Sequence, residues 1–475
     1  MLFNSLTFLV FFIIVYSLYI FLDHKRQNIM LLAASWVFYG WWDWRFLLLM
    51  IFSTSIDFFC GLKIDGSKDT QRRKFFLLVS ICANLIILGF FKYFNFFVSS
   101  LQALLSGFGI AIHPQFLHII LPVGISFYTF QAMSYAIDIY RGEITATKKF
   151  SEFALFIAFF PQLVAGPIER AKHLLPQISL PRKLTPEKFG EGCYLIFWGL
   201  FQKMFIADSL ARIVEPVFSA GAPYNGAMVL LALYAFAFQI FCDFAGYSNI
   251  ARGLGKCMGF DIMVNFNLPY FAVNPREFWQ RWHISLSSWL RDNLYIPLGG
   301  NRKGGLITYR NLGITMLLGG LWHGASWTFV IWGIYQGLLL IIHRLIEPLL
   351  KKIPSPKSIL AVKVWFWIRV VFFFHLICLG WLIFRARSMT QVFSMLHSLI
   401  FNFTASGTGI KPAAFDLVFF IWLLILVQVI QFIKKDPLFI LKSNVATKAL
   451  FFAACCYLVA KRGLPNGEAF IYYIF

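Results

Sequence analysis

One histidine of the chain lies inside an apolar run. Residues 317–333 read LLGGLWHGASWTFVIWG and contain His323. An ionisable group at membrane depth is costly, so it marks a functional site by default. Read as one helix, the run places Gly319, Gly320 and Ser326 on the face of His323, which leaves room for a substrate. A neutral imidazole there can take a proton from an alcohol, as acyl transfer to a hydroxyl requires; a structural histidine hydrogen-bonded across helices fits the residues equally well.

A second histidine lies in a short amphipathic segment, residues 274–300 (NPREFWQRWHISLSSWLRDNLYIPLGG). Read as one helix, the segment has a polar stripe with Arg281 and an aromatic stripe with Trp282. His283 and Ser287 lie one turn apart, between the stripes. This pattern predicts an interfacial or re-entrant helix whose basic residues receive a phosphate-rich donor near the cytosolic surface. A snorkelling interfacial helix without a ligand is the commoner fate of such stretches.

Three polar side chains recur at four-residue spacing in a third apolar segment, QIFCDFAGYSNIAR. Gln239, Asp243 and Tyr247 share one face if the segment is a helix. A carboxylate at membrane depth must be paired or protonated, so the stripe predicts the wall of a hydrated passage. A packing network without a passage is the alternative.

The composition behind these segments is that of a membrane protein. Apolar residues make up 59% of the 475 positions and charged residues 13%, whereas a soluble domain carries about 25% charged residues. The net charge of +21 comes from short basic clusters between apolar runs. This distribution follows the positive-inside rule and argues against a nucleic-acid partner, for which basic residues gather in one patch. The eight cysteines show no CxxC pair, so we expect neither a metal site nor a disulfide frame.

The apolar runs predict an all-α polytopic membrane protein. At about 20 residues per span they give about 11 to 13 transmembrane or re-entrant helices. We detect no internal repeat and no loop long enough for a separate soluble domain, so residues 1–475 are expected to form one integral-membrane domain. The basic clusters at Lys63–Lys74 and Lys351–Lys363 are expected on the cytosolic side.

Long stretches of the chain resemble a known family. QIFCDFAGYSNIARG, REFWQRWHISLSSWLRDNLYIPLGGNR and LLGGLWHGASWTFVIWG, in this order, are similar to membrane-bound O-acyltransferases (MBOAT) of the alginate O-acetylase branch. The resemblance implies a ring of helices around a central tunnel, with His323 as the catalytic histidine and His283 as a second, tunnel-lining one. It implies acetyl-CoA as the donor substrate and no bound cofactor. The tunnel or substrate-binding residues expected on this basis and from the stripes above are Gln239, Asp243, Tyr247, Arg281, Ser287, Trp322 and Ser326.

The carboxyl-terminal stretch, residues 463–475, ends in FIYYIF. It is similar to the F-x-Y-x-x-F tail of the small partner of the teichoic-acid D-alanyl transfer acyltransferase. The resemblance makes Tyr472 a candidate acyl carrier. The alternative is an aromatic belt that anchors the last helix.

These observations predict a membrane O-acetyltransferase of the bacterial inner membrane. It would move acetyl from cytosolic acetyl-CoA across the membrane for O-acetylation of an exported polysaccharide, either alginate or a similar exopolysaccharide, or peptidoglycan. The expected partners are membrane lipid, the polysaccharide acceptor and an extracytoplasmic esterase-like (SGNH-type) acetyltransferase that finishes the transfer. A multispanning transporter or flippase, with a polar tunnel and no ester chemistry, is the rival hypothesis.

Overall fold

The computed structural model describes residues 1–114, 116–164, 166–352, 358–407 and 409–463, and these residues form helices without any β-strand. Within them, six helices are long and apolar enough to cross a membrane: Trp44–Asp65, Thr70–Gly107, Gly226–Cys257, Trp327–Leu350, Ile359–Arg385 and Ile410–Lys434. Leu6–Phe21 and Met389–Phe401 are shorter apolar helices. The predicted all-α polytopic class is confirmed. The ring and its tunnel stay predictions.

The chain divides into two compact units. Unit 1 comprises Met1–Ile196 and Ile250–Met263, and unit 2 comprises Phe197–Asn249 and Val264–Phe475. The chain passes from one unit to the other within α10 (Pro186–Leu200), again within α12 (Gly226–Cys257), and a third time between Met263 and Val264. The prediction of a single functional membrane domain is untested by this division.

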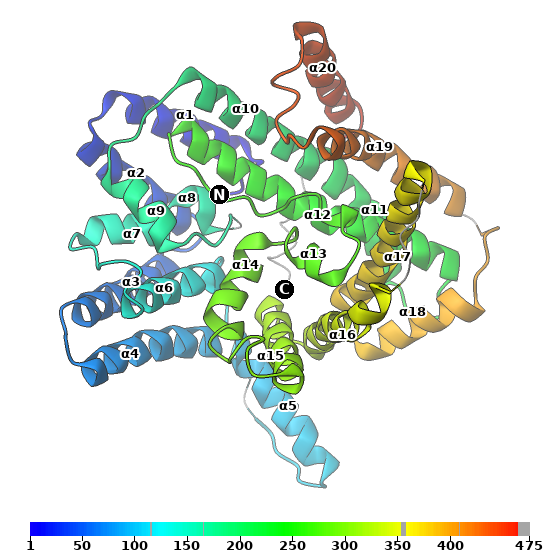
Figure 1. The fold of residues 1–475 in the computed structure, drawn as a ribbon, viewed down its shortest axis with the longest axis horizontal. Coiled ribbons are helices and arrows are strands. Elements are labelled where there is room, and N and C mark those ends of the chain that lie inside the picture. The colour runs from blue at the N-terminus through cyan, green and yellow to red at the C-terminus, as the bar shows by residue number, and fades with distance from the viewer. Residues whose placement is uncertain (115, 165, 353–357, 408, 464–475) are drawn as a thin grey trace. The chain divides into compact units, whose positions relative to one another are not determined.

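Unit 1 is a set of helices that begin at residues suited to cap them. Ser5 Oγ accepts the Phe8 N–H at 3.2 Å and Asp23 Oδ1 accepts the Arg26 N–H at 3.0 Å. Such caps satisfy the first N–H groups, which have no partner inside a helix. The helices are α1 (Leu6–Phe21), α2 (His24–Gly40), α3 (Trp44–Asp65), α4 (Thr70–Leu88), α5 (Phe94–Gly107), α6 (Ile125–Tyr140), α7 (Phe150–Ala158), α8 (Phe160–Leu163) and α9 (Ala171–Ser179), with a π-helical turn, η1 (Gly89–Tyr93), after α4 (Figure 1).

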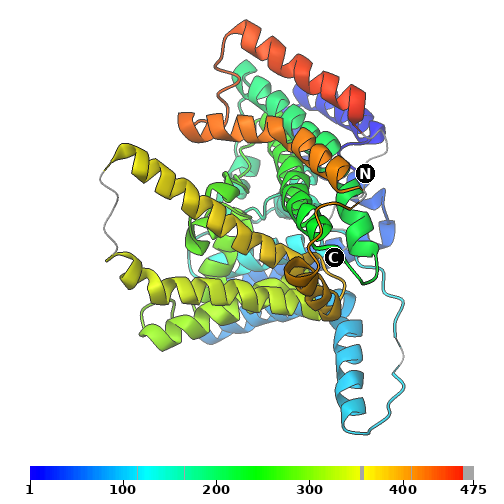
Figure 2. The same cartoon turned by 90° about the vertical axis from the view of Figure 1, so that its right-hand side faces the viewer.

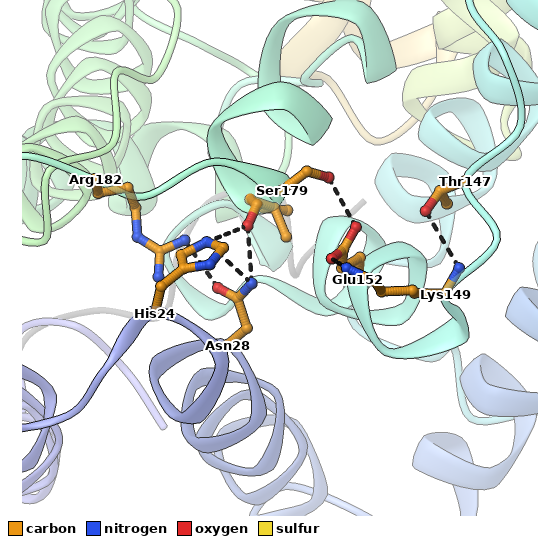
Figure 3. Close-up of polar contacts among 8 residues, drawn as sticks. His24, Asn28, Thr147, Lys149, Glu152, Ser179 and Arg182 are labelled. Carbon is orange, nitrogen blue, oxygen red and sulfur yellow. Dashed lines mark hydrogen bonds and ion pairs between the residues drawn. The ribbon is translucent and has the colours of Figure 1, made fainter.

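A polar network ties α2, α7 and α9 together within unit 1 (Figure 3). The side chains of His24 and Asn28 both contact the Ile178 carbonyl oxygen at 2.8 Å. Ser179 Oγ then donates to Glu152 Oε2 at 2.8 Å. The bonds to Ile178 satisfy a carbonyl group at the end of α9, and the bond from Ser179 joins α9 to α7.

Unit 2 holds two of the three segments singled out in the sequence and residues 239–249 of the third, which include Gln239, Asp243 and Tyr247. Its helices besides α12 are α11 (Asp208–Ser219), α13 (Pro275–Trp279), α14 (Ile284–Leu290), α15 (Gly305–His323), α16 (Trp327–Leu350), α17 (Ile359–Arg385), α18 (Met389–Phe401), α19 (Ile410–Lys434) and α20 (Val445–Arg462). Two π-helical segments, η2 (Phe201–Ala207) and η4 (Arg291–Tyr295), and one 3₁₀ turn, η3 (Pro269–Phe271), complete it. Irregular turns of the π type often mark functional sites in helices.

Glycines bring α15 and α16 into close contact. A Cβ atom on Gly320 would overlap the Phe329 carbonyl oxygen, and one on Gly333 would overlap the Met316 carbonyl oxygen. Small residues at these positions therefore let the two backbones touch, as in many membrane helix pairs. This contact fixes the corner of the chain that carries His323.

Candidate active site

His323 is the last residue of α15. The backbone of Gly324 is extended (φ −164°), and Ser326 starts α16 by accepting the Thr328 N–H with its Oγ at 3.3 Å. The run 317–333 is therefore two helices joined at a corner. The expectation that Ser326 lies on the helical face of His323 is wrong, because the cap at Ser326 begins a new helix.

Aromatic rings surround the His323 imidazole, which is 3% exposed. Its centroid lies 5.1 Å from the rings of Trp322 and Trp332 and 5.3 Å from Phe384, all close to edge-to-face. The His283 ring is 6.4 Å away. The rings of the two histidines and of Trp322 thus lie together.

The His323 side chain borders a cavity of about 570 Å³. Gly319, Ser287 and Trp332 line the same space. Gly319 lies one turn before His323 on α15 and leaves the wall open there, whereas Gly320 faces α16. A cavity of this size is typical of a small-molecule site. The small face predicted beside His323 therefore consists of Gly319.

Arginines gather on the wall of this cavity. Arg276, Arg291 and Arg344 line it, against one carboxylate, Glu347. Arg291 is held by Asp292 at 2.7 Å. Within the described residues, no hydrogen bond or ion pair engages the guanidinium groups of Arg276 and Arg344. The cavity therefore offers two guanidinium groups to an anionic ligand.

The arginine expected from the sequence occupies another place. Arg281 pairs with Glu277, with Nη2 and Oε1 2.7 Å apart, and its Nη1 donates to the Asn267 carbonyl oxygen at 3.3 Å. It is absent from the lining of the His323 cavity among the residues that the structure describes. Arg281 thus stabilises the turn before α14.

His283 lies at a break between α13 and α14, so the prediction of one continuous helix through residues 274–300 is wrong. Its backbone is left-handed (φ 43°, ψ 53°), a conformation that costs a non-glycine residue about 1–2 kcal/mol. Asn265 holds this turn: its carbonyl oxygen accepts the Ile284 N–H at 2.9 Å and its Oδ1 accepts the Ser285 N–H at 3.2 Å. Strain held by specific bonds is a common feature of functional sites.

The same amide fixes the proton on the His283 ring. His283 Nδ1 lies 3.2 Å from Asn265 Oδ1. The Ser285 N–H, which can only donate, identifies that atom as the oxygen. His283 Nδ1 must therefore carry the hydrogen, and Nε2 is left as the basic atom of the ring. The ring itself is fully buried and borders Phe244 at 4.6 Å.

Ser287 links the two histidines. Its side chain lines the cavity of His323, and its Oγ lies 3.0 Å from the carbonyl oxygens of both Trp282 and His283. The predicted one-turn spacing of His283 and Ser287 is present at the start of α14, where the Ser287 N–H donates to the His283 carbonyl oxygen at 2.9 Å. A movement of the His283 turn would therefore shift Ser287 and change the shape of the cavity wall.

The stripe on α12 meets a lysine that the sequence reading missed. Asp243 pairs with Lys203 at 2.7 Å, and Lys203 also pairs with Asp208 at 2.7 Å. All three are buried, and Lys203 lies 6.0 Å from the centre of the Tyr247 ring. Gln239 is buried on the same helix. In the described part of the chain this stripe forms no part of the His323 cavity, so its role in a hydrated passage stays a prediction.

Two kinds of signal explain what was missed. Lys203 stands alone in an apolar run, so intramembrane cost could have marked it. Asn265 stands in a loop 18 residues before His283, where no periodicity points to its partner. Tyr472 lies outside the residues that the structure describes.

Comparison with known proteins places the whole site in a family. The model of the membrane-bound O-acyltransferase family matches residues 145–383. The chain belongs to this family. This MBOAT member is 45% identical over 406 residues to the probable alginate O-acetylase of Azotobacter vinelandii, an alignment covering 85% of this chain and 78% of that protein.

Two further relatives of this MBOAT chain carry other acceptors in their names. The peptidoglycan O-acetyltransferase of Helicobacter pylori is 35% identical over 398 residues, 78% of this chain and 73% of that protein. The teichoic acid D-alanyltransferase of Streptococcus thermophilus is 32% identical over 240 residues, 46% and 56%. The chain is accordingly a multi-pass membrane O-acyltransferase, and the rival class of transporters is set aside. The roles of His323 and His283 stay predictions.

Proposed function

We propose that this MBOAT chain moves acetyl from cytosolic acetyl-CoA across the bacterial inner membrane for O-acetylation of an exported polysaccharide. The observation that carries the proposal is the position of His323 on a cavity walled by arginines. The imidazole can move a proton, and the guanidinium groups can hold a phosphate-bearing donor. The O-acetylase names of two relatives favour acetyl over other acyl groups.

In the proposed reaction His323 acts as a general base and then as a general acid. It takes the proton of the acceptor hydroxyl while that oxygen attacks the thioester carbonyl carbon and forms a C–O bond. The C–S bond then breaks, and the imidazolium returns the proton to the sulfur, which leaves as the thiol of CoA. The carbonyl groups at the C-terminus of α15 carry partial negative charge, which stabilises the imidazolium between these two steps.

Arg276 and Arg344 would hold the phosphates of the donor. An arginine fork matches a phosphate in geometry and charge, and neither side chain forms a hydrogen bond or ion pair with another described residue. The thioester end would then lie beside His323 and Gly319. Arg302, which is exposed and lies off the cavity wall, provides a matched control.

The donor is tested with acetyl-CoA and acetyl-pantetheine, which carries the thioester but lacks the phosphates. Arg276→Gln and Arg344→Gln should each raise the KM for acetyl-CoA about tenfold, as expected for loss of one charge-assisted contact. The KM for acetyl-pantetheine should not change, and Arg302→Gln should behave as the wild type. Equal changes in KM for both donors would show that Arg276 and Arg344 do not bind the phosphates of acetyl-CoA.

The acceptor is tested in cells. Relatives named for alginate and for peptidoglycan support an exported polysaccharide, with an alginate-like polymer first because that identity is higher. Mass spectrometry of envelope polysaccharides, with and without the chain, should show O-acetyl groups lost from one polymer. The transfer would be finished by the extracytoplasmic esterase-like partner. Its removal should leave the polymer unacetylated while the chain can still move one acetyl group from acetyl-CoA to its own proposed carrier, Tyr472.

Tyr472 remains the proposed acyl carrier between the two enzymes. A phenolic ester is an activated acyl donor, and a tethered phenol acts at high effective concentration. Tyr472→Phe should block polymer acetylation although it removes only the hydroxyl group, whereas Tyr473→Phe should have little effect. Full acetylation by the Tyr472→Phe protein would leave the tail as an anchor.

A further inference from the structure

A second cavity of unit 2 lies between α16 and α17. Its volume is about 760 Å³, and its wall is mostly apolar, including Ile342, Trp365, Phe366 and Phe372. The two helices are long and apolar enough to cross a membrane. In Figure 2 the end of α16 and the start of α17 lie further apart than the opposite ends of the two helices. The cavity is thus a groove along two membrane helices, and Lys351, from the basic cluster expected in the cytosol, lies on its wall.

One charged side chain on this wall forms no hydrogen bond or ion pair with the residues that the structure describes. Arg369 is the eleventh residue of α17, counted from Ile359, in a helix of 27 residues. It lines the groove, and within the described residues no hydrogen bond or ion pair engages its guanidinium group. A cation on the wall of an apolar groove in a membrane helix is costly unless an anion accompanies it. An anionic ligand beside Arg369 would lower this cost.

We propose that this groove binds one anionic phospholipid of the cytosolic leaflet, with its phosphate on Arg369 and an acyl chain along the aromatic wall. The charges favour an anionic headgroup. Lys351 also lines the groove, and its ammonium is held by Glu347 at 2.9 Å. The carboxylate is therefore occupied, so the ammonium of a zwitterionic headgroup has no free acceptor there, while Arg369 leaves one positive charge for the phosphate.

The groove shares two residues with the active-site cavity. His343 and Glu347 border both spaces, on one face of α16. The bound lipid would thus pack against the outer side of the wall whose inner side faces His323. An anionic lipid should accordingly restrict the movement of His343 and Glu347, which also border the active-site cavity. Acetyl transfer should therefore rise with the fraction of anionic lipid in the membrane.

Native mass spectrometry of the full-length protein in detergent tests the site directly, with phosphatidylglycerol and phosphatidylethanolamine as probes. The wild type should retain one phosphatidylglycerol more tightly than phosphatidylethanolamine. Arg369→Leu should weaken phosphatidylglycerol binding about tenfold and Arg369→Lys by less, because the lysine keeps the charge. Lys363→Leu is the control, since Lys363 is exposed on the same helix and lies off the groove wall.

Three results would overturn the proposal. The first is equal retention of the two lipids by the wild type. The second is unchanged phosphatidylglycerol binding by Arg369→Leu. The third is displacement of the lipid by acetyl-CoA, which would assign Arg369 to the donor. The first two results concern lipid binding alone, so they would leave the proposed acetyl transfer intact; that transfer is measured separately in the same preparations.

Discussion

His323 and His283 are neighbours with opposite surroundings. Their ring centroids are 6.4 Å apart. His323 stands at a helix end, beside a glycine, on a cavity of about 570 Å³. His283 is fully enclosed in a strained turn, and its Nδ1 hydrogen is committed to Asn265.

The difference separates a group that reaches substrate from one that is held in place. A general base must come within hydrogen-bond distance of the proton that it takes, which the cavity allows at His323. The closed network at His283 instead fixes a tautomer and shapes the first turn of α14, where Ser287 meets the cavity. The two histidines should therefore fail differently when they are replaced.

Replacing His323 should have the largest effect. His323→Ala removes the proposed base and acid, so acetyl transfer should fall by about 10²- to 10⁴-fold, the usual contribution of such a group. The measurement is acetyl-CoA turnover in proteoliposomes. The variant should insert normally and still bind acetyl-CoA, because the arginines of the cavity are unchanged.

His397→Ala is the matched control for this loss, because His397 is exposed on α18. It should leave turnover unchanged. Substantial turnover by the His323→Ala protein would transfer the catalytic role to another residue and erase the contrast between the histidines.

Replacing His283 or its partner should have an intermediate effect. We expect His283→Ala and Asn265→Ala each to lower turnover about ten- to a hundredfold, since both leave the His323 base in place but disturb the turn that supports Ser287. Because Asn265 holds the ring of His283, the double variant should lose no more than the worse single variant. Fully additive losses would show that Asn265 acts independently of His283.

Two adjacent glycines have different roles: Gly319 lines the cavity, whereas Gly320 packs against α16. Gly319→Ala places a methyl group 3.1 Å from Leu290 Cδ1 at the cavity wall, so turnover should fall several-fold while the folded yield stays normal. Gly320→Ala places it against the Phe329 carbonyl oxygen, so the yield should fall, as overpacking costs about 1–3 kcal/mol. Yield by fluorescence-detected size exclusion and turnover per folded molecule distinguish the two. The reverse pattern would mean that Gly320 is the residue that opens the cavity.

Much of this was accessible from the sequence, because intramembrane polar residues are conspicuous in an apolar chain. Hydropathy predicts the all-α class, and the cost of a buried imidazole singles out His323. The helix period then misplaces Ser326, because Gly324 and the cap at Ser326 end one helix and start another. Period-based reasoning assumes a continuous helix, and a short break removes that assumption.

Contacts between residues far apart in the chain could not be predicted from the sequence. Asp243 needs a partner, but only the structure brings Lys203 and Asp208 to it from the segment before α12. In the same way, Asn265 reaches His283 from a loop. The resemblance to a family supplied His283, whereas contacts between distant segments supplied the residues that hold it.

A third histidine, His173, has a carboxylate as its partner. Its test has the smallest expected effect. In unit 1, His173 Nδ1 lies 2.8 Å from Glu169 Oε2, and this hydrogen bond to a carboxylate raises the pKa of His173 against a smaller opposing effect of burial. By contrast, the partner of His283 Nδ1 is the uncharged side-chain amide of Asn265. Stability gained from a raised histidine pKa is fully present below the unfolded value of about 6.5 and is lost as the pH rises through the folded value.

Thermal unfolding at pH 6 and pH 8.5 tests this difference. The His173 side chain is 41% exposed, so solvent screening should limit the effect to about one degree in Tm. Glu169→Gln should remove the pH dependence of Tm that comes from His173, while Oε1 still accepts the Met263 N–H, which lies 2.6 Å from it in the native protein.

Asn265→Asp tests the opposite change at His283. A carboxylate beside His283 should make turnover more sensitive to acid than in the wild type, because it favours the protonated ring. An unchanged pH profile would mean that the charge of the His283 ring has no influence on turnover, so that its role is confined to shaping the turn before α14.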